Sequence, residues 1–259
     1  MGRTMVVTGA ASGIGKATAE LLRQQGDTVI GVDIRDADIT ADLGTPEGRA
    51  SLVEQVTAKS GGSIDGILAI AGIAAPIPAT ASVNFFGMVA TLEGLRPLLA
   101  GSSAPRAVGI ASMASLHPVD DELVAAMTAG DEAAAVARAE VLAEDPVTGN
   151  QIYSSSKKAF AQWIRRSAPS PEWAGANIPL NAIAPGVIVT PMTAPLLETE
   201  EGREQIRAGV PMPLNGFAEA IVPARLLVWL TSEENSHLCG QVIFIDGGSD
   251  AVIRGDSTW

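Results

Sequence analysis

The beginning of the chain contains the pattern that most limits its fold. Residues 4–8 form a short apolar run, and glycines follow at positions 9, 13 and 15. A helical pattern over residues 16–25 comes next, and a second apolar run over residues 28–32 leads to Asp33. A strand, a helix and a strand in this order predict a βαβ unit, in which the helix connects two parallel strands.

The glycine-rich turn of this unit also predicts a binding site. Glycines let the backbone approach a pyrophosphate closely, and the N-terminus of the following helix attracts the anion. Asp33 stands at the end of the second strand, near the position, about 20 residues after the glycines, at which an acidic residue binds the ribose of a dinucleotide. The glycine spacing differs from the usual dinucleotide pattern. A plain strand-to-helix turn is therefore the alternative, but the strand, the helix and Asp33 together favour nucleotide binding.

The alternation of strands and helices continues along the chain. Further strands are predicted over residues 64–70, 106–110, 178–184 and 241–245, and further helices over residues 46–59, 82–99, 151–167 and 218–230. Crossovers of this kind specify a parallel sheet that helices cover on both faces. We therefore predict one α/β domain over residues 1–259, a doubly wound parallel sheet of the Rossmann type.

Two segments depart from this alternation. Residues 116–150 hold two alanine-rich, acidic helical patterns, at 120–127 and 131–144, and predict a helical insertion with a solvated face. Residues 191–217 mix Pro, Met and Leu with charges and predict an irregular, flexible substrate lid. The apolar lid residues either form a binding face or simply seat the lid on the domain: Met192, Pro195, Leu196, Leu197, Pro211, Met212 and Leu214.

Tyr153 is the only tyrosine of the chain, and Lys157 stands four positions after it. Residues four apart on a helix share a face. A cation beside a phenol lowers the phenol pKa from about 10 toward neutrality, so that the phenol can exchange a proton at physiological pH. On these two residues alone, an ordinary exposed pair is an equally good interpretation. Asn84 is a poor helix former within a predicted helix, where it either bends the helix or holds a water.

The composition excludes several classes of function. A net charge of −12 argues against nucleic-acid or anionic-membrane partners. The single Cys239 excludes an internal disulfide, and two histidines make a metal site improbable. The N-terminal residues lack the pattern of a signal peptide, and no apolar run reaches the roughly 18 residues of a membrane-spanning helix. We therefore expect a soluble, cytoplasmic protein.

Together these motifs resemble the short-chain dehydrogenase/reductase family. The resemblance covers the chain in the family's order and is carried by Thr8-Gly9 to Gly15, Asn84, Ser112, Tyr153 with Lys157, Pro185-Gly186 to Thr190, and Asp246-Gly247-Gly248. The long segment between Ser112 and Tyr153 is similar to the bacterial 3α-hydroxysteroid dehydrogenase/carbonyl reductase subgroup, as are residues 31–38, 41–43, 46–49 and 245–254. One departure is Ala69-Ile70-Ala71-Gly72, where many members have Asn-Asn-Ala-Gly. The missing asparagines imply fewer hydrogen bonds between neighbouring strands.

The resemblance implies a catalytic set of four residues. Tyr153 is expected to be the general acid and base, and Ser112 to orient the substrate oxygen. Lys157 is expected to hold the nicotinamide ribose and to lower the Tyr153 pKa. Asn84 is expected to position a water that links Lys157 to solvent.

The resemblance also implies a site for NAD. The pyrophosphate is expected to contact Gly9, Ser12, Gly13, Ile14 and Gly15. Asp42 and Leu43 are expected to flank the adenine, Gly72 the adenosine side, and Ile188 and Thr190 the carboxamide. Asp33 repels a 2′-phosphate and Ile34 offers no positive charge, so NAD(H) is expected over NADP(H).

The implied reaction is reversible hydride transfer between NAD and a secondary alcohol/ketone pair. An apolar alicyclic or steroid-like alcohol and a terpene alcohol are both open as substrates, since a fold does not determine a substrate. Two other readings are a non-catalytic NAD-binding module, which has no need of Ser112, Tyr153 and Lys157, and a family member that catalyses dehydration or epimerisation. Because the insertion precedes a helix that the family often uses for tetramer contacts, we expect a homodimer.

Overall fold

A seven-stranded parallel sheet forms the centre of the computed structural model, which describes residues 2–257. Its strand order is β3-β2-β1-β4-β5-β6-β9, and β7 and β8 form a separate pair. The strands are β1 Thr4–Thr8, β2 Thr28–Asp33, β3 Ile39–Thr40, β4 Gly66–Ala69, β5 Arg106–Ile110, β6 Leu180–Pro185, β7 Ile188–Val189, β8 Ala218–Glu219 and β9 Val242–Ile245. The predicted parallel α/β sheet is confirmed.

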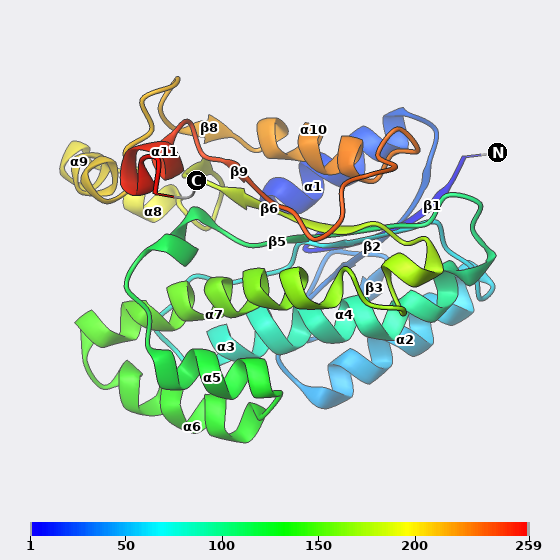
Figure 1. Cartoon of the computed structure of the whole chain (residues 1–259), viewed down its shortest axis with the longest axis horizontal. Coiled ribbons are helices and arrows are strands. Elements are labelled where there is room, and N and C mark those ends of the chain that lie inside the picture. Colours follow the sequence, from blue (N-terminus) through cyan, green and yellow to red (C-terminus); the bar gives the residue numbers. More distant parts are fainter. Residues whose placement is uncertain (1, 258–259) are drawn as a thin grey trace.

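Helices cover the sheet on both faces, with α1 and α10 on one and α2, α4 and α7 on the other (Figure 1). The α-helices are α1 Gly13–Gln24, α2 Pro46–Ser60, α3 Ala79–Ala81, α4 Met88–Leu95, α5 Asp121–Ala129, α6 Glu132–Ala143, α7 Pro146–Ser167, α8 Ala194–Leu197, α9 Glu200–Gly209, α10 Ile221–Leu230 and α11 Ser249–Arg254. Other helical turns are η1 Ser82–Gly87, η2 Arg96–Gly101, η3 Met113–Leu116 and η4 Ala174–Ala176. Within the described residues, no helix combines the length and the apolar character that crossing a membrane requires. The predicted domain also includes residues 1 and 258–259, which lie outside the described part of the chain.

The strand order places a crevice beside β1. β1 pairs with β2 on one side and with β4 on the other, and the chain reverses its direction of winding there. In sheets of this type, ligands bind outside the carboxyl ends of the strands at such a point. Fully buried side chains of the central strands hold the sheet between its helices, among them Val6, Val7, Leu68 and Val108.

The segment predicted as one helix over residues 82–99 is instead broken into several turns. It contains the π-helical η1, then α4, then the 3₁₀ turn η2. Asn84 lies within η1, where its side chain bonds to the backbone of Ile73 rather than to its own helix. A local widening of this kind is frequent at functional sites.

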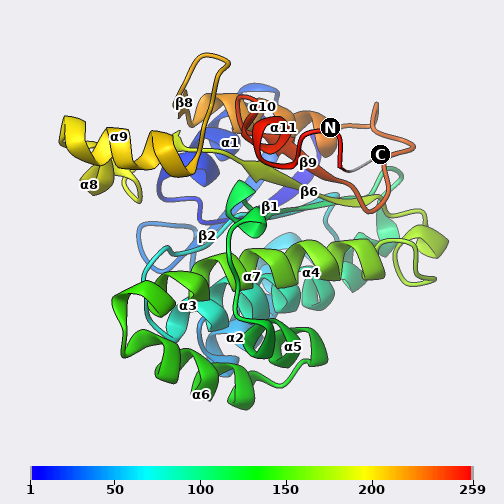
Figure 2. The same ribbon diagram turned by 60° about the vertical axis from the view of Figure 1, so that its left-hand side comes forward.

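The insertion forms a packed layer, with α5 and α6 beside α7 (Figures 1 and 2). Buried Leu123, Met127, Ala135, Ala139 and Leu142 hold the layer together, and the opposite face is exposed. Asp120 caps α5, because its Oδ1 accepts from Leu123 N at 2.8 Å. A cap at Asp145 begins α7 at Pro146, so this helix starts before the predicted residue 151.

The segment predicted as an irregular lid, residues 191–217, contains two helices, α8 and α9. Helix α9 begins where the Thr199 hydroxyl accepts from Gly202 N at 3.1 Å, and its two glutamates in the first turn suit the helix dipole. The prediction of a wholly irregular segment was therefore wrong. It missed a cap that the sequence contains.

Candidate active site

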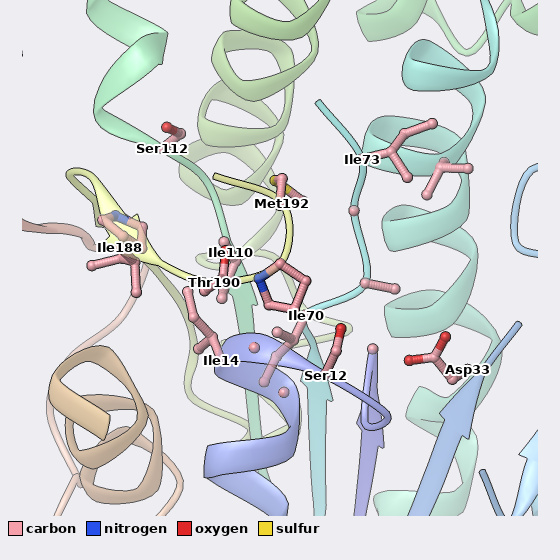
Figure 3. A pocket seen from close by; sticks show the side chains of 18 of the residues that line it. Ser12, Ile14, Asp33, Ile70, Ile73, Ile110, Ser112, Ile188, Thr190 and Met192 are labelled. Atoms are coloured by element: carbon pink, nitrogen blue, oxygen red, sulfur yellow. The ribbon is translucent and has the colours of Figure 1, made fainter. Parts of the chain in front are cut away.

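A cavity of about 280 Å³ opens at the carboxyl ends of the central strands (Figure 3). Asp33 lies on one side of it and Ser112 on the opposite side. All the residues predicted to bind the cofactor line this cavity: Gly9, Ser12, Gly13, Ile14, Gly15, Asp33, Asp42, Leu43, Gly72, Tyr153, Lys157, Ile188 and Thr190. The fold therefore brings together residues that are far apart in the sequence, from Gly9 to Thr193.

The glycine-rich turn brings backbone close to the cavity at the start of α1. Gly9 and Gly13 have positive φ angles of 71° and 52°. A Cβ on Gly15 would lie 2.1 Å from the carbonyl oxygen of Gly9, and a Cβ on Gly13 would lie 3.3 Å from Thr190 Cγ2. Side chains are thus disfavoured at positions 13 and 15, while Ser12 and Ile14 of the same turn line the cavity. This backbone cradle fits the pyrophosphate of a dinucleotide.

The Asp33 carboxylate is held in place at the end of β2. Oδ2 accepts from Ala11 N at 3.0 Å, and Oδ1 accepts from Ile34 N at 2.7 Å. Because each carboxylate oxygen has a further acceptor site, both can still accept from ribose hydroxyls. Ile34 beside it is 62% exposed and uncharged. This arrangement fits a ribose with free hydroxyls better than one that carries a phosphate.

Thr8 is a residue whose role the sequence analysis missed. Its buried hydroxyl accepts from Ile70 N at 2.9 Å and from Ala71 N at 3.1 Å, which ties β1 to the end of β4. It supplies cross-strand hydrogen bonds in the region where the family's asparagines are missing. Its place at the end of a predicted strand, directly before Gly9, is the signal that could have indicated this.

Tyr153 and Ser112 come from α7 and from the end of β5. The Ser112 Oγ accepts from Ala114 N at 3.1 Å, and both residues line the cavity. The partial burial of Tyr153 raises its pKa, and a hydrogen bond with the Ser112 side chain opposes that rise. The expectation of a lowered Tyr153 pKa was therefore wrong for the protein by itself, because loss of hydration is the larger effect.

Lys157 is 3% exposed, and its Nζ donates to the carbonyl of Ile110 at 3.0 Å. Burial lowers the pKa of Lys157 from 10.5 to about 7. Its Nζ lies 5.7 Å from the centre of the Tyr153 ring. Since this ammonium is charged only part of the time near pH 7, it has little power to lower the pKa of the phenol.

Asn84 lies behind the cavity wall and is fully buried. Its Oδ1 accepts from Ile73 N at 2.9 Å, and its Nδ2 donates to Ile73 O at 2.9 Å and to Ser156 Oγ at 3.2 Å. A Cβ on Gly72 would lie 3.1 Å from Asn84 Oδ1 and 3.6 Å from Lys157 Nζ. Gly72 therefore lets both groups approach one point of the wall. The predicted water relay remains a prediction.

A second cavity of about 290 Å³ joins the first at Ser112, Tyr153, Gly186, Met192 and Thr193. Its further walls are mostly apolar, and they include Ala74, Pro76, Met113, Leu196, Ile206 and Val210. Of the lid residues named from the sequence, Met192 and Leu196 line it.

Other lid residues seat the segment instead. Leu197 is buried, and Met212 Sδ accepts from Val187 N at 3.3 Å. The interpretation that such residues seat the segment therefore holds for Leu197 and Met212, and a binding face at Met192 and Leu196 remains a prediction. The sequence analysis missed His117 and Asn150 of this cavity. The His117 ring joins the loop after β5 to α9, with Nε2 3.1 Å from Gly209 O.

The described residues contain no group of three or more His, Cys, Asp or Glu side chains that could hold a metal ion.

Comparisons with known proteins agree with this geometry. A family model described as enoyl-(acyl carrier protein) reductase matches residues 9–250. The chain is 38% identical to 3-alpha-hydroxysteroid dehydrogenase/carbonyl reductase of Comamonas testosteroni, over 96% of this chain and 97% of the relative. It is 30% identical to coniferyl-alcohol dehydrogenase of a Pseudomonas species, over 95% of this chain and 96% of the relative.

A solved structure with the same fold is the 3-alpha-hydroxysteroid dehydrogenase of Pseudomonas sp. B-0831 complexed with NADH. It is 37% identical, has a TM-score of 0.89, and the match covers 98% of this chain and 99% of that one. On the match to the family and on these relatives, the chain belongs to the short-chain dehydrogenase/reductase family and is an oxidoreductase with a nicotinamide cofactor.

Proposed function

We propose that the protein is an NAD-dependent dehydrogenase that interconverts a secondary alcohol and a ketone on an apolar alicyclic substrate, and that it acts as a homodimer in the cytoplasm. The observation that carries the proposal is the meeting of two cavities at Ser112 and Tyr153. One cavity has the backbone cradle and the carboxylate for a dinucleotide, and the other has mostly apolar walls. A substrate carbon and a nicotinamide ring can therefore meet beside one phenol.

The protein manages the proton of the reaction. The bound dinucleotide supplies the hydride acceptor in oxidation and the hydride donor in reduction. Because burial raises the pKa of Tyr153, the phenol carries its proton at neutral pH and can donate it to the oxygen of a ketone. In the oxidation direction, the phenol must first release its proton, and the resulting phenolate removes the hydroxyl proton of the alcohol.

Ser112 assists at the same substrate oxygen. A serine hydroxyl has one donor and two acceptor positions, and Ala114 N uses one acceptor position. When a substrate is bound, the O–H can turn from the Tyr153 side chain to the substrate oxygen, where it stabilises the negative charge that develops during reduction. Lys157 lies in the same wall, and its pKa of about 7 suits proton exchange near neutral pH.

The walls of the second cavity support the choice of substrate. Apolar side chains from the lid and from the loop after β4 suit a hydrocarbon ring system. The Comamonas relative and the solved structure from Pseudomonas sp. B-0831 are named hydroxysteroid dehydrogenases, which favours a steroid-like alcohol. A volume of about 290 Å³ is small for a ligand site. A terpene or another small cyclic alcohol is therefore the second candidate.

The test is a panel of secondary alcohols, steroid, terpene and monocyclic, incubated with NAD and with NADP side by side. We expect NADH to accumulate with at least one cyclic alcohol and the NADP reactions to be much slower. If the protein bound NADH but neither oxidised any alcohol nor reduced any ketone, the dehydrogenase function would be overturned and a binding module would be left. Faster turnover with NADP would overturn the cofactor preference that is assigned to Asp33.

A further inference from the structure

Arg49, in the first turns of α2, connects the wall of the dinucleotide cavity to the insertion. Its Nε donates to the carbonyl of Leu43 at 2.8 Å, and its Nη2 donates to the carbonyl of Gly44 at 3.3 Å. The same guanidinium forms a two-pronged ion pair with Glu132, in which Nη1 donates to Oε2 at 2.7 Å and Nη2 donates to Oε1. Glu132 is the first residue of α6.

These contacts are mostly enclosed by protein. The Arg49 side chain is 11% exposed and that of Glu132 is 27% exposed. The guanidinium also lies over the ring of Phe86, 6.0 Å from its centre, and Phe86 belongs to η1. A bidentate pair in such surroundings is stronger and more directional than an exposed ion pair. The guanidinium thus stands at a junction of α2, α6, η1 and the loop after β3.

The loop that Arg49 holds lines the Asp33 side of the cavity, through Asp42 and Leu43. The other hydrogen bonds of this loop include bonds between near neighbours. Asp42 Oδ1 accepts from Gly44 N at 2.9 Å, and Asp42 O accepts from Thr45 N at 3.2 Å. Because Arg49 bonds to two successive carbonyls of this loop, a shift of its guanidinium moves the wall of the cavity.

We propose that Glu132 and Arg49 are positioning residues for the adenine half of the cofactor, so that the insertion contributes to cofactor affinity. Glu132 lies outside the cavity and acts through Arg49, which in turn holds Leu43 and Gly44. The inference needs only that the protein binds NADH, and it is independent of the substrate proposed above.

The test compares Glu132→Gln with a matched control, Glu140→Gln, on the exposed face of the same helix. Glutamine keeps the size of the side chain and removes its charge. The intact proteins are titrated with NADH by fluorescence, and ADP-ribose, which carries the adenine half, is titrated by competition. We expect Glu132→Gln to raise both dissociation constants by roughly three- to tenfold and Glu140→Gln to leave both unchanged.

A second variant, Arg49→Lys, keeps the charge but cannot bond two carbonyls and two carboxylate oxygens at once. This variant is expected to weaken the binding of NADH in the same way. In steady-state turnover with saturating substrate, both variants should raise KM for NADH and leave kcat within about twofold, because the reacting groups are untouched.

Three outcomes would overturn the inference. The first is an NADH affinity equal to wild type in Glu132→Gln or in Arg49→Lys. The others are a weaker affinity for NADH with an unchanged affinity for ADP-ribose, and a fall in kcat with an unchanged KM for NADH. The titrations require no substrate. A protein that binds NADH but oxidises no alcohol therefore contradicts the proposed function and still tests the role of Glu132.

Discussion

At the scale of single residues, Tyr153 is the group that we propose exchanges the proton, because its side chain lines both cavities where they meet. Replacement by phenylalanine keeps the ring in the wall and removes only the hydroxyl group. We expect Tyr153→Phe to lower kcat by about 10²- to 10⁴-fold, the usual contribution of a positioned acid or base, with NADH affinity unchanged. Steady-state kinetics and NADH fluorescence titration measure the two quantities. Turnover close to wild type would rule out the acid–base role.

Lys157 should lower the stability of the protein by itself, because its ammonium is buried. A pKa lowered from 10.5 to about 7 corresponds to a destabilisation on the order of 5 kcal/mol. Below pH 7 both the folded and the unfolded states hold the proton, so the full destabilisation by the buried ammonium is present. Between pH 7 and 10.5 the unfolded chain binds more protons than the folded protein, so stability rises with pH through this window.

We therefore expect Lys157→Met to be more stable than wild type at pH 6 to 7, with its advantage shrinking as the pH rises toward 10. Denaturant unfolding at several pH values measures this. Lys158→Met, on a partly exposed neighbour, is the control. Its free energy of unfolding should change with pH in parallel with that of wild type. If the stability of Lys157→Met also changed with pH in parallel with that of wild type, the burial of a titrating ammonium would be contradicted.

At the scale of elements, η1 is a widened turn that joins two parts of the active-site wall. Asn84 bonds to both the N–H and the C=O of Ile73, so it fastens the loop after β4 to this helical segment. We expect Asn84→Ala to lower the free energy of unfolding by about 1–3 kcal/mol per polar group left without a partner. Thr91→Val, which removes only a bond to Gly87 O within the same helical region, is the milder comparison. If denaturant unfolding gave Asn84→Ala the stability of wild type, the loop would be held by other contacts.

The insertion shows how an added segment is integrated into a fold. Helices α5 and α6 are begun by Asp120 and Asp131, whose carboxylates cap them. Asp120 also pairs with Arg138, whose hydrogen bond lowers the pKa of that carboxyl. The buried residues of the insertion face α7, and Glu132 of α6 faces Arg49. The insertion is therefore linked both to the helix of Tyr153 and to the loop of Leu43.

At the scale of the whole molecule, a dinucleotide that spans the cavity touches elements from both halves of the sheet and should stabilise them together. At a concentration 100 times its dissociation constant, NADH is expected to add about 2.7 kcal/mol of stability, which raises Tm by roughly 5–10 °C for a domain of this size. Thermal melts with equal concentrations of NADPH are the comparison. An equal shift with NADPH would contradict discrimination by Asp33.

The assembly of the molecule is also open to measurement. Because α5 and α6 cover part of α7 (Figure 2), a tetramer contact that used that face would meet the insertion instead. We expect sedimentation equilibrium to give twice the mass of one chain. A mass of four chains would contradict the homodimer.

The sequence by itself determined the parts of the protein that depend on short stretches of chain. The βαβ unit follows from the period of its apolar residues, the cradle from glycines at 9, 13 and 15, and Asp33 from its distance along the chain. The spacing of Tyr153 and Lys157 put both on one helix. These features are local because backbone geometry and side-chain period are set by near neighbours.

Only the tertiary structure decided the features that depend on burial or on residues distant in sequence. Burial raises the pKa of Tyr153 and lowers that of Lys157, against the expectation from their spacing alone. Thr8 meets Ile70 across two strands, and Arg49 meets Glu132 across the insertion. Such contacts arise when packing excludes water from groups that the chain brings together from far apart, and no local pattern contains that information.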